Sequence, residues 1–226
     1  MHNSQVVALV PMRHHSQRVP QKNFRDLAGK PLFHHILTTL IKCELVSQIV
    51  VDTDSPVISQ DILKNFPDVI VIDRPKHLLA DDVPMNDILI FDTRQVKSDL
   101  FLQTHSTNPL LKPETISKAI KVFTEQDPIQ FDSLFSVTSM KTRLWDRFTK
   151  PINHDPEVLL QTQDLPPVYE ENSCIYLFWS QNLVKRRNRI GESPMMFEIP
   201  PDEALDIDDE QDFLIADLLM RNRSRA

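Results

Sequence analysis

The amino-acid sequence predicts an α/β fold with a mainly parallel sheet and helices on both faces. Short apolar runs of strand length alternate with stretches in which apolar residues recur at helical spacing. The first run, Val6–Val10, is apolar at every position, as expected of a strand buried on both faces of a sheet. A chain of 226 residues with 41% hydrophobic residues is long enough to bury a core. We therefore expect one domain over residues 1–226.

The predicted elements follow one another in regular order. After the first strand, a helix begins at Pro31 and carries one apolar stripe as far as Ile41. Further strands are predicted at 48–54, 69–73, 100–106, 133–140 and 174–180. Further helices are predicted through 58–63, over 85–97, from Pro113 to Phe123 and over 209–220. Connections of this kind join parallel strands and place helices on both faces of the sheet.

Residues 141–171 interrupt the alternation. They are rich in Pro, Asp and Gln, yet they also contain Trp145, Phe148 and the pair 159–160, which is Leu-Leu. A plain linker would hold fewer large apolar side chains. We therefore predict an inserted lobe that serves as an interface, and the alternative is a plain surface excursion.

Composition excludes several classes of partner. A net charge of −7 argues against nucleic-acid binding, which needs a basic face. We expect no membrane span, because no apolar run approaches the ~18 residues that one requires, and the N-terminal residues do not resemble a secretory signal. Cys43 and Cys174 lie far apart, so we expect two free thiols in a reducing cytoplasm.

Polar side chains gather directly after the predicted strands, where ligands bind in open α/β sheets. The segment behind the first strand is basic, with Arg13, Arg18 and Lys22 among almost no acids. Later strand ends supply further polar residues, namely Asp52, Asp54, Gln103, Thr104 and Ser106, and the pair Asp206 and Asp208 precedes the last helix. Cations suit phosphate groups, and a carboxylate pair suits Mg²⁺ that also binds substrate phosphates.

Each of these features has a simpler explanation. A basic loop is often only solvated. Asp52 and Asp54 could cap the helix that follows them. Asp208 is the natural N-cap of the last helix, with Gln211 as its capping-box partner, although this would leave Asp206 unexplained.

Four motifs occur in a fixed order over nearly the whole chain. They lie at Pro11–Asn23 with Gly29–Leu32, at Leu102–Leu111, at Asn172–Leu177 and at Asp206–Phe213. In this order they resemble the motifs of the acylneuraminate cytidylyltransferases, the family that includes the CMP-sialic acid synthetases. The resemblance implies a Rossmann-like nucleotidyltransferase fold in which the insertion forms a dimerisation lobe, so a homodimer is expected.

The resemblance also implies an activity and a set of site residues. The reaction is a Mg²⁺-dependent transfer of CMP from CTP to the anomeric hydroxyl of an acidic 2-keto sugar, with release of pyrophosphate. Arg13 and Lys22 would hold the triphosphate, and Asp206 and Asp208 would bind Mg²⁺. The expected catalytic residues are Arg13, Lys22 and Asp208, and the expected substrate-binding residues are Arg13, Arg18, Asn23, Gln103 and Asn172.

The sequence departs from the family pattern in two places. In the basic loop, His14 and His15 replace small glycines, Gln17 replaces a lysine and Arg18 replaces a glycine. We expect Arg18 to replace the charge lost at Gln17. Residues 85–87, which are Met-Asn-Asp, replace a hydroxyl-rich segment. Two hypotheses remain, a working cytidylyltransferase and a non-catalytic homologue that binds a nucleotide or sugar as an interaction subunit.

Overall fold

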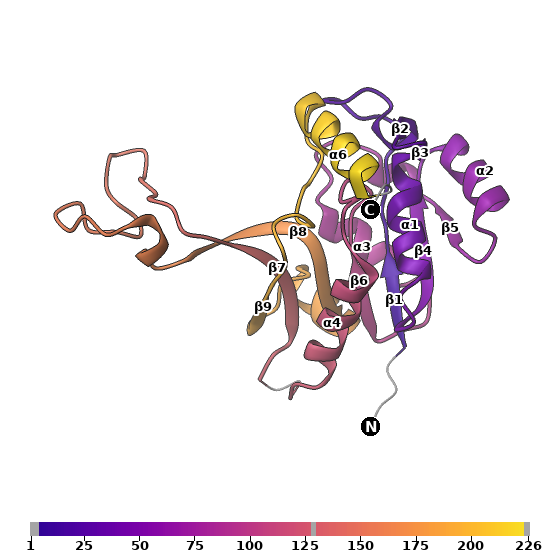
Figure 1. Cartoon of the computed structure of the whole chain (residues 1–226). Helices are drawn as coiled ribbons and strands as arrows, with labels where there is room; N and C mark the ends of the chain where they lie inside the picture. The colour runs from indigo at the N-terminus through magenta and orange to yellow at the C-terminus, as the bar shows by residue number, and fades with distance from the viewer. Residues whose placement is uncertain (1–4, 128–129, 224–226) are drawn as a thin grey trace.

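The computed structural model describes residues 5–127 and 130–223. Its centre is a seven-stranded sheet in the order β5-β4-β1-β6-β8-β7-β9 (Figure 1). Its strands are β1 (Val6–Leu9), β4 (Val46–Thr53), β5 (Ile70–Asp73), β6 (Leu100–Gln103), β7 (Ser133–Met140), β8 (Val168–Trp179) and β9 (Pro194–Glu198). Among the described strands of this sheet, β8 alone runs antiparallel to its neighbours. The predicted mainly parallel sheet is therefore confirmed.

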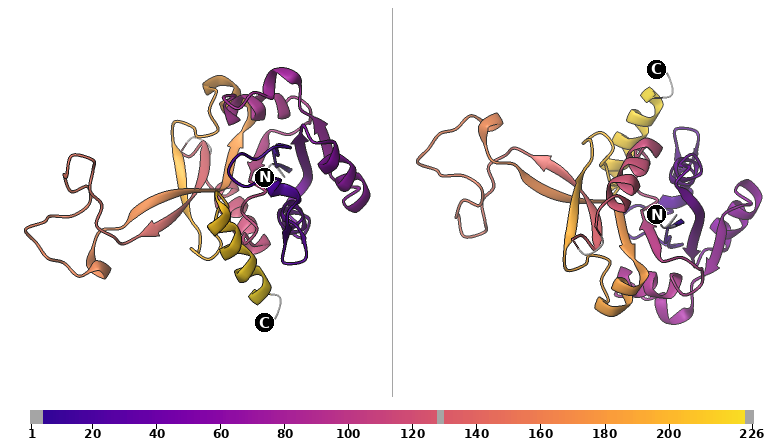
Figure 2. Two further views of the ribbon diagram at one scale, coloured as in Figure 1. Left: turned by 90° about the horizontal axis from the view of Figure 1, so that it is seen from above. Right: turned by 90° about the horizontal axis from the view of Figure 1, so that it is seen from below.

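Helices cover both faces of the sheet, as predicted (Figure 2). They are α1 (Leu32–Ile41), α2 (Pro56–Asn65), α3 (Met85–Asp92), α4 (Pro113–Thr124), α5 (Ser180–Arg186) and α6 (Glu210–Arg223). Successive side chains of a strand point to opposite faces. Val6 and Ala8 of β1 accordingly pack with α1, α2 and α4, whereas Val7 and Leu9 pack with α3 and α5.

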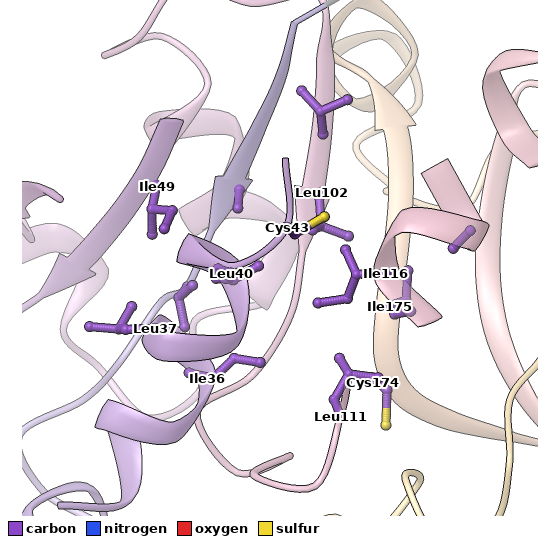
Figure 3. Close-up of a cluster of buried hydrophobic side chains, with 14 of the residues drawn as sticks. Ile36, Leu37, Leu40, Cys43, Ile49, Leu102, Leu111, Ile116, Cys174 and Ile175 are labelled. Atoms are coloured by element: carbon purple, nitrogen blue, oxygen red, sulfur yellow. The ribbon is translucent and has the colours of Figure 1, made fainter. Parts of the chain in front are cut away.

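The larger part of the core lies between α1, α4 and the sheet. Figure 3 shows Leu40 of α1 and Ile116 of α4 beside Leu102 of β6 and Ile175 of β8. Each of these four side chains is fully buried. Burial of one such side chain stabilises a protein by ~1.5–3 kcal/mol, so this cluster is a main source of stability for the sheet.

A short hairpin connects the first strand to α1. It consists of β2 (Asp26–Leu27) and β3 (Lys30–Pro31). Gly29 has a φ of 93° in its turn, a conformation that glycine adopts without strain. The last helix, α6, packs Phe213 and Ala216 against Leu27 of this hairpin. The C-terminal helix and the segment after β1 are thereby brought to the same edge of the molecule.

Three local features differ from the prediction. The helix predicted over 85–97 ends at Asp92, and a turn follows it. The helix α5 and the strand β9 were not predicted. The strand β9 lies at the edge of the sheet, beside β7, and only Phe197 within it is buried. Its apolar pattern is therefore too weak to be recognised locally.

The predicted insertion forms an extended arm rather than a compact lobe. It leaves the sheet between β7 and β8 and projects away from the body of the molecule (Figures 1 and 2). The strand β8 begins at Val168 and pairs with Met140, so the segment outside the strands covers 141–167 instead of 141–171. Large apolar side chains on the arm are exposed, with Phe148 at 65% and Leu159 at 90%. The apolar side chains on which the predicted interface rests are thus exposed, and the interface itself stays a prediction.

Two further predictions concern the thiols and membrane spans. Cys43 and Cys174 are both buried and both free, as predicted. Burial raises the pKa of the Cys174 thiol. Within 5–127 and 130–223, none of the helices has the length and apolar character that crossing a membrane requires.

Candidate active site

The basic loop and the acidic pair meet at one edge of the sheet. The side chain of Lys22 donates a hydrogen bond to the backbone oxygen of Ile207 over 2.6 Å. Arg18 forms an ion pair with Asp208 at 2.7 Å, although 190 positions separate the two in sequence. The structure thus brings together the candidate phosphate-binding cations and the candidate metal ligands, which the predicted strand ends and the resemblance had both associated.

The last helix is capped one residue later than predicted. Asp209 accepts hydrogen bonds from the backbone N–H groups of Gln211 and Asp212, at 2.8 and 3.0 Å. The carboxylate of Asp212 in turn accepts from the backbone N–H groups of Asp208 and Asp209. The capping box is therefore Asp209 with Asp212, and not Asp208 with Gln211. The side chains of Asp206 and Asp208 are consequently not used to cap α6.

Asp206 has a carboxylate oxygen that is buried without a partner. Its Oδ1 atom accepts no hydrogen bond from the described residues. Burial raises the pKa of Asp206, and the neighbouring Asp208 adds to this, whereas Thr107 and Lys22 oppose it. Burial also lowers the pKa of Lys22, although both carboxylates oppose that shift. An orphaned oxygen beside a second carboxylate fits one side of a Mg²⁺ site.

The remaining ligands of such an ion would have to come from substrate and water. Within the described chain, no cluster of three or more His, Cys, Asp or Glu side chains is arranged to hold a metal. Two carboxylates are nevertheless a usual protein contribution to Mg²⁺, which keeps several waters and binds substrate phosphates. The donor set therefore fits Mg²⁺ better than a metal that needs a complete protein cage.

Asn172 shares a pocket with the acidic pair. The pocket has a volume of about 480 Å³, and Asn172, Asp206 and Asp208 all line it. The amide of Asn172 accepts a hydrogen bond from Ser136 at 2.6 Å and donates one to Thr138 at 2.9 Å. Both partners lie on β7, so the amide is locked in place as part of the pocket wall.

The side chains of Asn23 and Gln103 form hydrogen bonds that connect separate segments of the site. Asn23 donates to the backbone oxygen of Arg13 at 3.0 Å and accepts from Ser106 at 2.7 Å, which ties the basic loop to the segment after β6. Gln103 is fully buried at the end of β6. Its side-chain oxygen accepts a hydrogen bond of 2.7 Å from Arg189.

Further contacts fasten the basic loop on its other side. Arg13 forms an ion pair with Asp81 at 2.8 Å, and Gln17 donates to the same carboxylate at 2.7 Å. The backbone N–H of His14 donates to Asp54 at 2.7 Å. Asp54 therefore supports the loop, while Ser55, and neither Asp52 nor Asp54, caps α2. No pattern in the sequence indicated that the exposed Asp81 belongs to this site.

A buried charge network lies under the same loop. Asp52 at the end of β4 forms an ion pair with Arg74, and both side chains are almost completely buried. Arg74 also reaches the backbone oxygen of Met12, at 3.5 Å. Burial and the neighbouring Asp52 raise the pKa of Asp92 to about 9, so Asp92 is protonated at neutral pH. This network supports the base of the loop and was not predicted.

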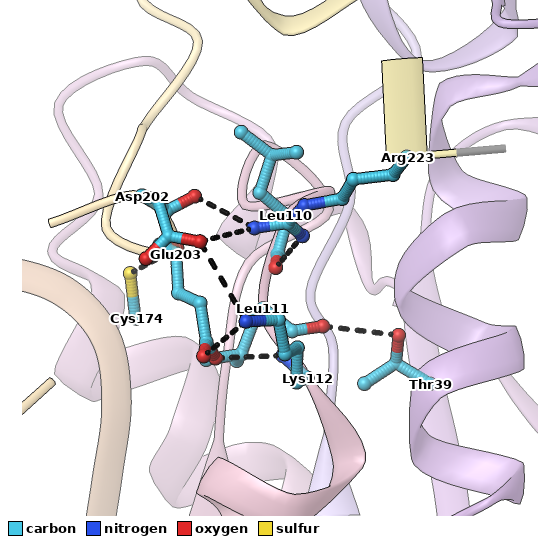
Figure 4. Close-up of polar contacts among 8 residues, drawn as sticks. All are labelled: Thr39, Leu110, Leu111, Lys112, Cys174, Asp202, Glu203 and Arg223. Carbon is cyan, nitrogen blue, oxygen red and sulfur yellow. Dashed lines mark hydrogen bonds and ion pairs between the residues drawn. The ribbon is translucent and has the colours of Figure 1, made fainter. Parts of the chain in front are cut away.

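The segment that carries the acidic pair is anchored at its start (Figure 4). Buried Glu203 accepts a hydrogen bond of 3.0 Å from the backbone N–H of Lys112 and forms an ion pair with its side chain at 3.1 Å. Asp202 forms an ion pair with Arg223 at 2.9 Å. Because these contacts join the segment to α4 and α6, they restrict the position of Asp206.

Sequence reasoning also missed Arg189 at this edge. Arg189 lies in the turn after α5, where its guanidinium donates to Gln103 and stacks on the ring of Tyr176, 3.6 Å from the ring centroid. The available signal was the basic run at 185–189, whose proximity to Gln103 depends on the tertiary structure.

Sequence comparison identifies relatives over the whole chain. The profile of the cytidylyltransferase family matches residues 7–215. The chain is 28% identical to the CMP-N,N'-diacetyllegionaminic acid synthase of Legionella pneumophila, over 98% of both chains. It is 25% identical to N-acylneuraminate cytidylyltransferase A of Danio rerio, over 94% of this chain and 50% of the longer fish protein. These findings confirm the resemblance drawn from the four motifs.

Solved structures confirm the fold. The CMP:2-keto-3-deoxy-manno-octonic acid synthetase complexed with CTP superposes with a TM-score of 0.72 at 16% identity, covering 97% of this chain and 100% of that one. The 4-diphosphocytidyl-2C-methyl-D-erythritol synthase of Anaerococcus prevotii has a TM-score of 0.67 at 11% identity, covering 97% of both chains. With the matching profile, the ordered motifs and this fold, the chain belongs to the cytidylyltransferase family.

Proposed function

We propose that this protein is a Mg²⁺-dependent cytidylyltransferase that activates an acidic 2-keto sugar. The anomeric oxygen would form a bond to the α-phosphorus of CTP while the bond to the β-phosphate breaks. The hydroxyl would release its proton to water, and the products would be the CMP-sugar and pyrophosphate. The proximity of Arg18 and Lys22 to Asp206 and Asp208 is the observation that carries this proposal.

The side chains would act mainly by positioning and by neutralising charge. Lys22 and Arg13 would hold the triphosphate, with Arg18 as a further cation in place of the charge missing at Gln17. Asp206 and Asp208 would hold Mg²⁺, which when bound would neutralise charge on the phosphate oxygens. The partly buried position of Lys22 strengthens its attraction for phosphate, because water screens it less.

The amides would complete the substrate site. Asn23 lies between the basic loop and Ser106, which suits a role in seating the cytidine. Gln103 and Asn172 would line the side occupied by the sugar. Because all three amides make hydrogen bonds within the protein, their contribution would include fixing the shape of the site.

We further propose a homodimer formed through the arm, in the cytoplasm. The exposed apolar side chains of 141–167 support the dimer, because water contact of such residues is unfavourable unless another surface covers them. The two free, buried thiols support a reducing compartment.

One observation favours the alternative, a non-catalytic homologue. The loop cations are already paired within the protein, Arg13 with Asp81 and Arg18 with Asp208. A triphosphate would have to displace these contacts. Such surface ion pairs contribute only ~0–1 kcal/mol each, so displacement is not a strong barrier.

A single assay separates the two functions. The protein is incubated with CTP, Mg²⁺ and each of three acids, namely N,N'-diacetyllegionaminic acid, N-acetylneuraminic acid and 3-deoxy-manno-octulosonate, and pyrophosphate release is measured. Sugar-dependent release is expected with at least one acid and not with ATP in place of CTP. Binding of CTP by calorimetry without turnover on any acid would favour the non-catalytic homologue.

A further inference from the structure

The turn that carries Arg189 is held by the segment that departs from the family pattern. The backbone N–H of Arg189 donates to the side chain of Asn86 at 3.1 Å. Asp87 forms an ion pair with Arg187, which ends α5 in a left-handed conformation with φ 54°. Asn86 and Asp87 lie in the first turn of α3, so the Met-Asn-Asp segment at 85–87 positions the turn at 187–189.

The guanidinium of Arg189 is fixed on two sides. It donates to Gln103 at 2.7 Å and lies over the ring of Tyr176, 3.6 Å from the centroid. Tyr176 is itself held, because its hydroxyl donates to Glu171 and lies 3.3 Å from Ser173. A cation stacked on an aromatic ring keeps its plane and its donors in a defined direction.

The positive charge of Arg189 is not compensated. Across residues 5–127 and 130–223, no carboxylate forms an ion pair with this guanidinium, whereas Arg186 and Arg187 of the same run both have acidic partners. The positive charge of Arg189 also acts on the half-buried His105. Its pKa is lowered to about 3, mainly by burial, and Arg189 and Lys22 both contribute. The two cations therefore act on the same part of the site.

We propose that Arg189 binds the carboxylate of the acidic sugar and thereby selects acid substrates over neutral ones, an inference that rests on the proposed function. A guanidinium with a fixed plane matches the geometry of a carboxylate and can donate two parallel hydrogen bonds to it. Its neighbours Gln103 and Tyr176 are fully buried and hold the guanidinium in place from the protein side. Asn86 is a positioning residue for this contact.

The test compares the best sugar acid with its neutral C1 carboxamide as acceptors. In the wild type, the KM of the acid should be lower than that of the amide by on the order of ten- to a hundredfold, the usual value of a charge-assisted contact. Arg189→Gln should raise the KM of the acid by that factor and leave the KM of the amide nearly unchanged. Arg189→Lys keeps the charge and should recover part of the preference.

Controls separate selection from damage to the fold or to the nucleotide site. Arg186→Gln removes a neighbouring charge that is paired with Glu192, and it should retain the acid preference. Arg189→Gln should keep its affinity for CTP and its unfolding midpoint. Asn86→Ala should reduce the acid preference by a smaller factor, without a change in CTP affinity, since it only loosens the turn.

Three results would overturn the proposal. The first is an Arg189→Gln variant that loses activity on acid and amide equally. The second is a loss of CTP affinity with the acid preference retained, which would place the guanidinium at the nucleotide. The third is a wild type that binds CTP but uses none of the acids, and this result would reject the proposed function as well.

Discussion

The sheet and the arm of this protein differ in the exposure of their apolar side chains. Leu9 in β1 and Leu40 in α1 are fully buried by their own chain, whereas Leu159 on the arm is 90% exposed. The sheet therefore obtains its stability within one chain. On the arm, Phe148 and Leu159 face water instead. Apolar side chains thus stabilise the fold in the sheet, whereas on the arm they would be covered by a second copy of the chain under the proposed dimer.

The largest expected effect tests this contrast directly. Leu40→Ala should lower the free energy of unfolding by about 2–5 kcal/mol, because it leaves a cavity in the core. Leu159→Ala should change the free energy of unfolding of the monomer by less than about 0.5 kcal/mol, because this side chain is already exposed to water. Urea unfolding at low protein concentration measures both. Similar losses in the two variants would show that the arm packs within its own chain.

The next prediction concerns Asp208, a proposed Mg²⁺ ligand in the body of the protein. Asp208→Asn should reduce turnover by on the order of a hundredfold or more, since a neutral amide is a poor ligand for Mg²⁺. Its stability should change little, because the ion pair with Arg18 is exposed.

Asp209→Asn is the matched control for this variant. Asp209 is the helix cap, and Asn is an equally good N-cap, so this variant should retain both turnover and stability. Equal turnover of both variants and the wild type in steady-state assays would reject the metal assignment.

Association is expected to depend on the arm. Phe148→Asp places a charge on an exposed apolar surface and should weaken a homodimer more than tenfold, with the fold retained. Val184→Asp, also exposed but on α5, is the control and should leave assembly unchanged. Sedimentation velocity over a concentration series measures the equilibrium. A wild type that remains monomeric at micromolar concentration contradicts the proposed dimer.

A smaller effect is expected at Arg18. Arg18→Ala should weaken CTP binding by at least about tenfold, the lower value of one charge-assisted contact, even though the change also releases Asp208 from its ion pair. His15→Ala should cost much less, because a neutral imidazole offers no charge. Calorimetric titration with CTP compares them, and wild-type affinity in Arg18→Ala would mean that the charge lost at Gln17 is not replaced there.

The last prediction concerns the pH dependence of stability at Asp92, where the effect within a single pH unit is small. Its folded pKa of about 9 lies far above the usual value of about 4 for an Asp side chain, so its contribution to stability is complete below about pH 4 and is lost as the pH rises toward 9. Asp92→Asn removes this dependence. Relative to the wild type, the free energy of unfolding of the variant should rise by at most about 1.4 kcal/mol for each unit by which the pH increases in that window. Parallel pH profiles of urea unfolding would show that Asp92 is not protonated in the native state.

The sequence alone determined the fold class, because the patterns behind it are local. Apolar runs and helical stripes predicted β1, α1 and their successors, since the period of a strand or helix depends only on neighbouring residues. The motif order predicted the family, and the apolar content of 141–171 favoured an inserted lobe that serves as an interface. The edge strand β9 was not predicted, because only Phe197 within it is buried.

Only the tertiary structure decided how the site is assembled. The cap of α6 falls on Asp209, and Asp208 instead meets Arg18 from the far end of the sequence. Arg189 reaches Gln103 because β8 runs antiparallel beside β6, which no local pattern reveals. Burial of Asp206 and protonation of Asp92 likewise depend on which elements cover them. Charges act through space and through the surrounding dielectric, so their effects follow the fold and not the order of residues.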